Sequence, residues 1–431
     1  MPPFGTALAP KFFAALACML LAVPAAAQSS KKNICTVCGE DPKVMEAAGI
    51  VNHGPFTFFQ SDSAELQKHL DARDMVWLET THFRFGSDLH PWKIPVSDKK
   101  AYLAELEELA AFFPAVDPPK VKMLDRWMRV HLMAFRMEKA YAHLQELFGY
   151  TEEQFAVLPA EEIFVSASDS TWQADLAADF LSRPKRAAGM PGWVGLGRYL
   201  GMPMKFEVLM LHYEADLLET KQHYIGHIDA HPQRWHNTWR PPNTEPVSRS
   251  MWFGFSTEAD KMKHDQHVHN ALLHNVTINI LDGFMLYLVE APVWLRSGFG
   301  HYMSRRNSMK YNFYDLDEGS SEQSRDAEEW KPLVRKYVTK DEAPGFSELS
   351  RMRSFGDLNF VAHLTSWSKL MFLMEHDPTA FGKWIVQLKT DPNQTNNLDA
   401  QRVAFKDNFG WTFIEADEKW AAWVLETYAV K

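Results

Sequence analysis

The sequence predicts an α+β protein: a small mixed β-sheet with helices, followed by a mainly helical C-terminal part. Short stretches of strand-forming residues all lie within the first 255 positions. Apolar residues at helical spacing dominate the rest of the chain. A length of 431 residues with 46% apolar side chains suffices for a sizeable core, which excludes a disordered chain.

The first 27 residues have the features of a secretory signal peptide. Lys11 precedes an apolar run, Phe12 to Val23, that is too short to span a bilayer. Small residues follow this run, so we expect cleavage after Ala27. The mature chain is therefore expected in a periplasm or outside the cell.

Charge and hydropathy exclude two classes of partner. The net charge of -10 gives no electrostatic reason to expect nucleic acid. The apolar stretch at 276–295 contains Asp282 and Glu290, and charges are costly at bilayer depth. We therefore expect a buried helix there and no membrane span in the mature chain.

Two cysteines, Cys35 and Cys38, remain after cleavage. In an exported protein such a pair favours a local disulfide. No histidine follows Cys38, which excludes a c-type haem, and no buried strand precedes the pair as in thiol-disulfide enzymes. A zinc site would need two more ligands, for which His53 and His69 are the nearest candidates. The sequence thus predicts a structural disulfide and no metal or other cofactor.

The next elements follow from residue patterns. Residues 75–85 alternate bulky and polar side chains, which predicts a strand with one buried face. Residues 99–113 and 123–148 have helical periodicity. His131 lies on the apolar stripe of the second helix, which favours a hydrogen-bonded core histidine over a metal ligand.

Later segments complete the expected fold. Residues 205–211 and 250–255 are strand candidates. The Trp-, His- and Pro-rich insertion between them predicts an irregular loop; it contains Trp235, His236, Trp239, Pro241 and Pro242. Residues 315–344 predict an exposed charged connection, and residues 346–428 a helical tail.

The chain accordingly divides into six parts. They are a signal peptide at 1–27, an N-terminal region with the cysteines, a strand and a helical hairpin at 28–150, an α/β region at 151–255, a helix pair at 256–314, a charged linker at 315–345, and a helical region at 346–431.

The helix pair carries two motifs, LLHNVTI at 272–278 and PVWLRSGFGHY at 292–302. Together they resemble the gluzincin zinc metallopeptidases, which carry H-E-x-x-H on one helix and a motif similar to W-L-x-E-G-x-A-x-Y on the next. Weaker matches in the same order extend the resemblance over about residues 75 to 425. It implies a peptidase-like fold with residues 268–281 as the motif helix.

The same resemblance implies that catalysis has been lost. His274 matches the first zinc ligand, but Ile278 and Ser297 stand at the other two ligand positions. Asn275 stands at the position of the general base, and an amide cannot hold a proton near neutral pH. We expect an inactive peptidase-like protein without catalytic residues, whose partly buried cleft binds a polypeptide or cell-envelope ligand.

Two alternatives remain at this point. In an active zinc hydrolase, relocated ligands would come from His264, His267, His274 or His301, with His363 as a further donor. The base would then be Asp265, Asp282 or Glu290. His264, His267 and His301 could instead support the motif residues without binding metal. The other alternative is a structural protein of the envelope.

Overall fold

The computed structural model describes residues 34–58, 61–70, 74–149, 164–166, 193–195, 205–220, 234–237, 250–284, 291–314, 329–390 and 398–429. The chain divides into two units, Met1–Ile34 and Cys35–Lys431, and every described helix and strand belongs to the second. The predicted signal peptide lies outside the described residues.

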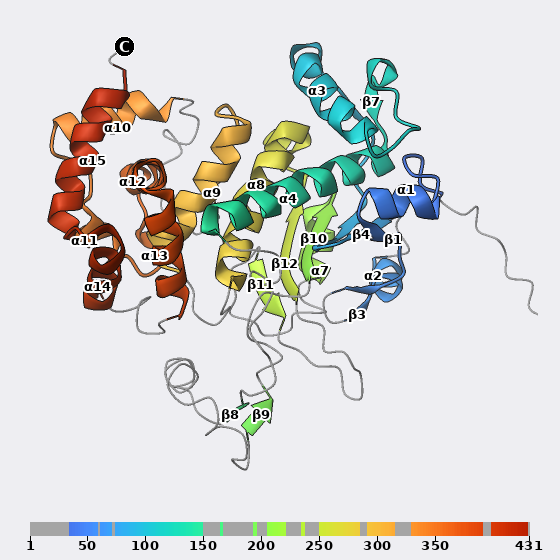
Figure 1. Cartoon of the computed structure of the whole chain (residues 1–431). Helices are drawn as coiled ribbons and strands as arrows, with labels where there is room; N and C mark the ends of the chain where they lie inside the picture. The colour runs from blue at the N-terminus through green and yellow to red at the C-terminus, as the bar shows by residue number, and fades with distance from the viewer. Residues whose placement is uncertain are drawn as a thin grey trace, which may run out of the picture. The chain divides into compact units, whose positions relative to one another are not determined.

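A mixed sheet of six strands organises the second unit (Figure 1). Its strands, in spatial order, are β1 (Ile50–Asn52), β4 (Val76–Thr80), β5 (Phe83–Ser87), β10 (Lys205–Leu211), β12 (Ser250–Ser256) and β11 (Arg234–Asn237). The three central strands, β5, β10 and β12, run parallel, and the outer pairings are antiparallel. The predicted α+β class with a mixed sheet is confirmed.

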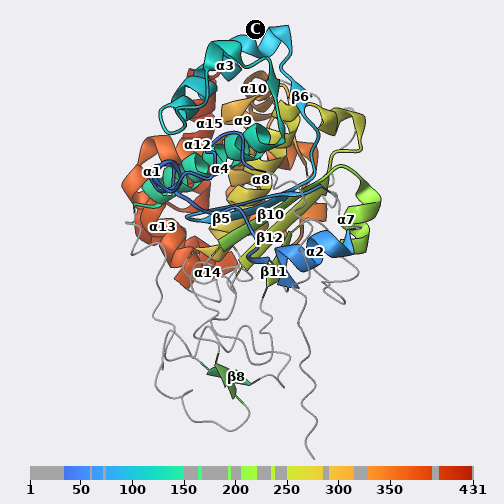
Figure 2. The same cartoon turned by 90° about the vertical axis from the view of Figure 1, so that its right-hand side faces the viewer.

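Helices cover both faces of this sheet (Figure 2). Helices α4 (Arg126–Phe148) and α8 (Asp265–Gly283) pack on one face, and α2 (Ser63–His69) and α7 (Glu214–Thr220) lie on the other. Because successive strand residues point to opposite faces, each strand contributes to two cores. The larger core lies beneath α4 and α8.

The smaller core contains two tryptophans whose rings need glycine beside them. Trp77 and Trp252 are buried on the α2 and α7 side of the sheet. A Cβ atom on Gly86 would lie 2.4 Å from the Trp77 ring, and one on Gly254 would lie 2.2 Å from the Trp252 ring. Only glycine therefore fits at these two strand positions.

Helix α4 connects the sheet to the rest of the molecule. Asp125 caps its first turn by accepting a hydrogen bond from the Met128 N–H at 2.8 Å. Gly149 ends the helix in the left-handed region with φ of 73°. The helix carries His131 and Arg136 in its buried length.

The remaining elements are short strands and further helices. Before α8 they are α1 (Pro42–Ala47), α3 (Lys99–Ala110), β2 (Thr57–Phe58), β3 (Ser61–Asp62), β6 (Trp92–Lys93), β7 (Met123–Leu124), β8 (Phe164–Ser166) and β9 (Trp193–Gly195). After α8 they are α9 (Val293–Asn307), α10 (Trp330–Thr339), α11 (Phe346–Leu349), α12 (Phe360–His376), α13 (Pro378–Thr390), α14 (Leu398–Phe409) and α15 (Phe413–Thr427). None of these described helices combines the length and apolarity needed to cross a bilayer.

Most predicted elements are present. The helices predicted at 99–113, 123–148 and 268–281 correspond to α3, α4 and α8, and the predicted helical tail corresponds to α11 to α15. The single strand predicted at 75–85 is wrong, because a hairpin occupies this region. Thr80 pairs with Phe83 through its hydroxyl, so the chain reverses at residues 81 and 82.

Two segments predicted as irregular contain regular structure. Residues 234–237, placed in the predicted irregular loop, form β11 against β12; Trp239, Pro241 and Pro242 lie outside the described residues. Helix α10 lies within the predicted charged connection. It forms there because Trp330 and Val334 are one helical turn apart and bury the same face.

Candidate functional site

The two motif helices, α8 and α9, pack directly against each other. The His274 ring on α8 lies 4.8 Å from the His301 ring on α9, measured between centroids. Gly300 makes this approach possible, since a Cβ atom there would lie 2.7 Å from His274 Nδ1. The structure therefore places His274 beside His301, one of the residues expected to support the motif.

A third helix completes the group, which we call the histidine centre: His274, Ser297, His301 and His363. His363 lies on α12, and its Nδ1 is 2.9 Å from Ser297 Oγ and 3.0 Å from His301 Nε2. All four side chains are fully buried, as are Asn275 and Ile278. The partly buried cleft expected at His274 is thus wrong: the motif positions lie inside the core.

Burial sets the protonation of His301 in the histidine centre. Desolvation holds the pKa of His301 well below its ordinary value, and the neighbouring His274, His363 and Arg305 act in the same direction. His301 is therefore a neutral imidazole near pH 7. A neutral ring can donate one hydrogen bond and accept one, which suits a packed polar network.

Asn275, at the position expected for the general base, makes a local hydrogen bond instead. The Asn275 side-chain amide donates a hydrogen bond to the Ala271 carbonyl on the preceding turn, at 2.9 Å. Ile278 contributes only hydrocarbon to the core. Asn275 and Ile278 thus provide neither a general base nor zinc ligands, and the nearby histidines do not form a close group of metal-ligating atoms among the described residues.

Two of the relocated-ligand candidates, His264 and His267, do not join His301 and His363 around His274. His264 caps the start of α8, and its Nε2 lies 3.1 Å from the Tyr311 hydroxyl and 3.3 Å from Asp98. His267 is buried beside Tyr311, with ring centroids 5.9 Å apart. Neither forms a group of close metal-ligating atoms with His274 in the described part of the chain.

Two of the three candidate bases are held in ion pairs. Asp265 lies between Arg129 and Arg136, each 3.2 Å away, and Asp282 pairs with Arg296 at 2.8 Å. Both carboxylates are buried. Glu290 lies outside the described residues.

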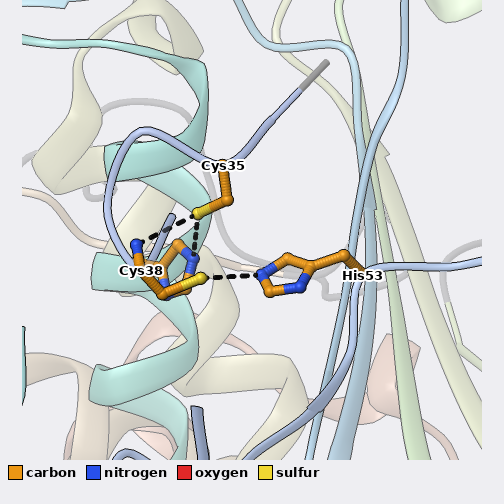
Figure 3. A group of neighbouring side chains, drawn as sticks. Cys35, Cys38 and His53 are labelled. Carbon is orange, nitrogen blue, oxygen red and sulfur yellow. Dashed lines mark hydrogen bonds between the residues drawn. The ribbon is translucent and has the colours of Figure 1, made fainter. Parts of the chain in front are cut away.

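A second group, which the sequence did not assemble, surrounds the two cysteines (Figure 3). Cys35 and Cys38 are not joined, so the predicted disulfide is wrong in this structure. The sulfur of Cys35 lies 3.1 Å from His131 Nε2, and that of Cys38 lies 3.3 Å from His53 Nε2. We call these four residues the Cys-His centre.

Hydrogen bonds favour one thiolate in the Cys-His centre, on Cys38, whereas the hydrogen bond with Cys38 and burial raise the pKa of Cys35 and keep it a thiol without metal. The Cys35 side chain lowers the pKa of the Cys38 thiol most strongly, and His131, His53 and the Glu40 backbone act in the same direction against burial. Burial lowers the pKa of His131, which keeps this imidazole neutral. Thiolate and neutral imidazole are the forms in which these side chains bind metals.

Of the two histidines that the sequence suggested as zinc ligands, the structure places one beside the cysteines and the other elsewhere. His53 joins the cysteines, whereas His69 lies 3.6 Å from Glu219. His131 also lies beside the cysteines. Its predicted burial is confirmed, but the prediction of a core histidine did not include its contact with Cys35. The sequence feature that could have indicated this group is the C-x-x-C pair followed by His53, at a sequence spacing that metal sites allow.

Comparison with known proteins gave no relatives. No family model, curated protein or solved structure matches the chain. The resemblance to gluzincins therefore depends on the motif residues and on the order of the elements around them.

Proposed function

We propose that the chain is an exported, catalytically inactive protein of gluzincin-like architecture that binds a polypeptide or another cell-envelope component. One observation carries the inactivity: the positions that would provide base and ligands hold Asn275, Ile278 and Ser297, all fully buried. Zinc hydrolases need three protein ligands and a position open to water. The histidine centre is fully buried, so it has no position open to water, and its histidines do not form a close metal-ligating group among the described residues.

The arrangement of elements supports the gluzincin-like part of the proposal. Helix α8 packs on the sheet through β10 and β12, and α9 packs on α8. This places both motifs on neighbouring helices, as the resemblance implies. The proposed protein thus keeps the sheet and the helix pair of the gluzincin-like architecture but lacks the zinc ligands and the general base.

The edge of the sheet favours polypeptide as the ligand class. Among the described strands, β11 is the last in its sheet and pairs only with β12. An edge strand leaves one row of backbone groups available to an extended peptide, which can add as a further strand. Main-chain hydrogen bonds of this kind tolerate many peptide sequences.

Casein, an extended polypeptide, provides a direct test. Fluorescein-labelled casein should bind the chain and remain intact after prolonged incubation with added zinc. Fluorescence anisotropy measures binding, and gel electrophoresis measures cleavage. Cleavage that a chelator abolishes would establish an active hydrolase instead, and intact casein without binding would favour the envelope structural protein.

Restoring the lost groups tests the motif alignment. The triple variant Asn275→Glu, Ile278→His, Ser297→Glu should bind one zinc ion more than the parent chain. It should also unfold at a lower temperature without that zinc, because unpaired carboxylates are costly to bury. Metal analysis and thermal denaturation with and without zinc measure both effects.

The matched control adds His274→Ala to the triple variant. This change removes the one ligand that the natural chain retains, so the additional zinc should disappear. Comparing each variant with its parent cancels any zinc bound elsewhere in the chain. A folded triple variant that gains no zinc would refute the assignment of these positions.

A further inference from the structure

The Cys-His centre joins three segments that are far apart in sequence. Cys35 and Cys38 lie in a turn before α1, His53 directly follows β1, and His131 lies on α4. In Figure 3 the sulfurs of Cys35 and Cys38 and the ring of His53 point into one small space. The four donor atoms all lie within 4.8 Å of one another. No other group of this kind occurs among the residues that the structure describes.

The donor spacing is close to that of a tetrahedral metal site. Zinc bonds of about 2.3 Å to sulfur and about 2.1 Å to nitrogen place neighbouring donors about 3.4 to 3.8 Å apart in a tetrahedral site. The two sulfur–nitrogen distances are 3.1 and 3.3 Å. Small side-chain adjustments are enough to admit an ion among the four donors.

We propose that the Cys-His centre binds one zinc ion as a closed structural site. Two thiolates and two imidazoles at tetrahedral spacing select zinc over calcium or magnesium, which prefer oxygen ligands. Binding forms two zinc–sulfur and two zinc–nitrogen bonds and releases the protons of the thiols to solvent. The sequence predicted a disulfide between these cysteines and no metal. The proposed zinc site replaces both predictions.

Burial indicates a structural role for this zinc. Cys35, Cys38 and His131 are 1%, 5% and 1% exposed. Four protein ligands fill a tetrahedral shell, so no coordination position is open to a substrate. The ion would instead attach the N-terminal turn and the edge strand β1 to α4.

The surrounding side chains hold the ligands in place. The Thr36 hydroxyl donates to Asp125, the residue that caps α4, at 2.9 Å. Trp127 packs edge-on against the His53 ring at 5.3 Å, and Phe113 against the His131 ring at 5.0 Å. These contacts fix the turn and both imidazoles before metal arrives, which reduces the entropic cost of binding.

The second nitrogen of His131 also fits a metal ligand. Its Nδ1 is buried and has no hydrogen-bond partner among the described residues. A zinc-bound Nε2 requires the proton on Nδ1, where a carbonyl, carboxylate or water normally accepts it. A cavity of about 280 Å³ borders His131 and has room for such a water.

A redox-active thiol pair is the competing interpretation of C-x-x-C. Such cysteines lie at a helix N-terminus with the attacking thiol exposed. Here both sulfurs are buried, and α1 begins only at Pro42. A redox pair also gives no reason for two imidazole nitrogens to converge on the sulfurs.

Metal analysis of the full chain, purified without chelator, tests the proposal. We expect about one zinc per chain, falling below about 0.1 in the Cys35→Ser, Cys38→Ser variant, since two imidazoles alone bind zinc poorly. The control His69→Ala, which changes a histidine outside the centre, should keep its zinc. Unchanged zinc content in the double-serine variant would overturn the proposal.

A second measurement avoids variants that fail to fold. Cys35 and Cys38 of the natural chain should react slowly with a maleimide and quickly after a zinc chelator is added, with zinc restoring protection. Peptide mass mapping identifies the modified cysteines. A Cys35–Cys38 disulfide in the purified chain, or labelling that the chelator does not change, would refute a zinc site. These readouts are independent of casein binding and of the histidine centre.

Discussion

Replacing Asp265 with asparagine should lower the free energy of unfolding by about 3–5 kcal/mol. The carboxylate is fully buried and lies 3.2 Å from both Arg129 and Arg136. Tyr102 donates a hydrogen bond to it at 2.7 Å. Removing the charge leaves two buried guanidinium groups without their common counter-ion, and urea denaturation measures the loss.

The expected loss of stability is large because Asp265 links three helices. Tyr102 lies on α3, both arginines on α4, and Asp265 in the first turn of α8. Burial raises the pKa of Asp265, but the two arginines and the Tyr102 hydrogen bond together outweigh it and lower the pKa overall. The ionised carboxylate therefore orients α8 on α4.

Asp399→Asn is the matched control, because it removes the same charge at the surface. The Asp399 side chain is 85% exposed and pairs with Arg402 at 3.1 Å. Such pairs contribute about 0–1 kcal/mol. Equal effects of the two substitutions would contradict the buried network.

Helices were more predictable from the sequence than turns or strand pairing. The motif helix was expected at 268–281 and occupies 265–283, because apolar periodicity is a local property. The reversal between β4 and β5 lacks glycine and proline, so no turn signal divided the predicted strand. Strand β11 depends on pairing with β12, which its own sequence does not specify.

The side chains that form the two histidine-containing centres and the Asp265 network were harder to predict than the helices. The stripe on α4 correctly indicated that His131 is buried, but periodicity identifies a face and not what packs against it. Cys35 is 96 positions away in sequence. Asp265 likewise read as a candidate base until the fold placed two arginines beside it.

Acidification should destabilise the chain through His269 and His301. Burial lowers the pKa of each well below 6.5, with Arg136 acting further on His269, and His274, His363 and Arg305 on His301. Below pH 6.5 the unfolded chain takes up protons on these two histidines, whereas the native chain does not. Stability is therefore fully present above pH 6.5 and declines as the pH falls below it.

The expected slope is about 1.4 kcal/mol per pH unit for each histidine, or nearly 3 for both together, once the pH is well below 6.5. Urea denaturation at several pH values between 7 and 5 measures it. His301→Gln should reduce the slope by about 1.4 kcal/mol per unit, whatever it does to stability at pH 7. Titrating groups away from the histidine centre, including those of the Cys-His centre, contribute equally to parent and variant. The difference between their slopes therefore reports His301 together with its coupling to His274 and His363, and identical slopes would show that the buried ring does not resist protonation.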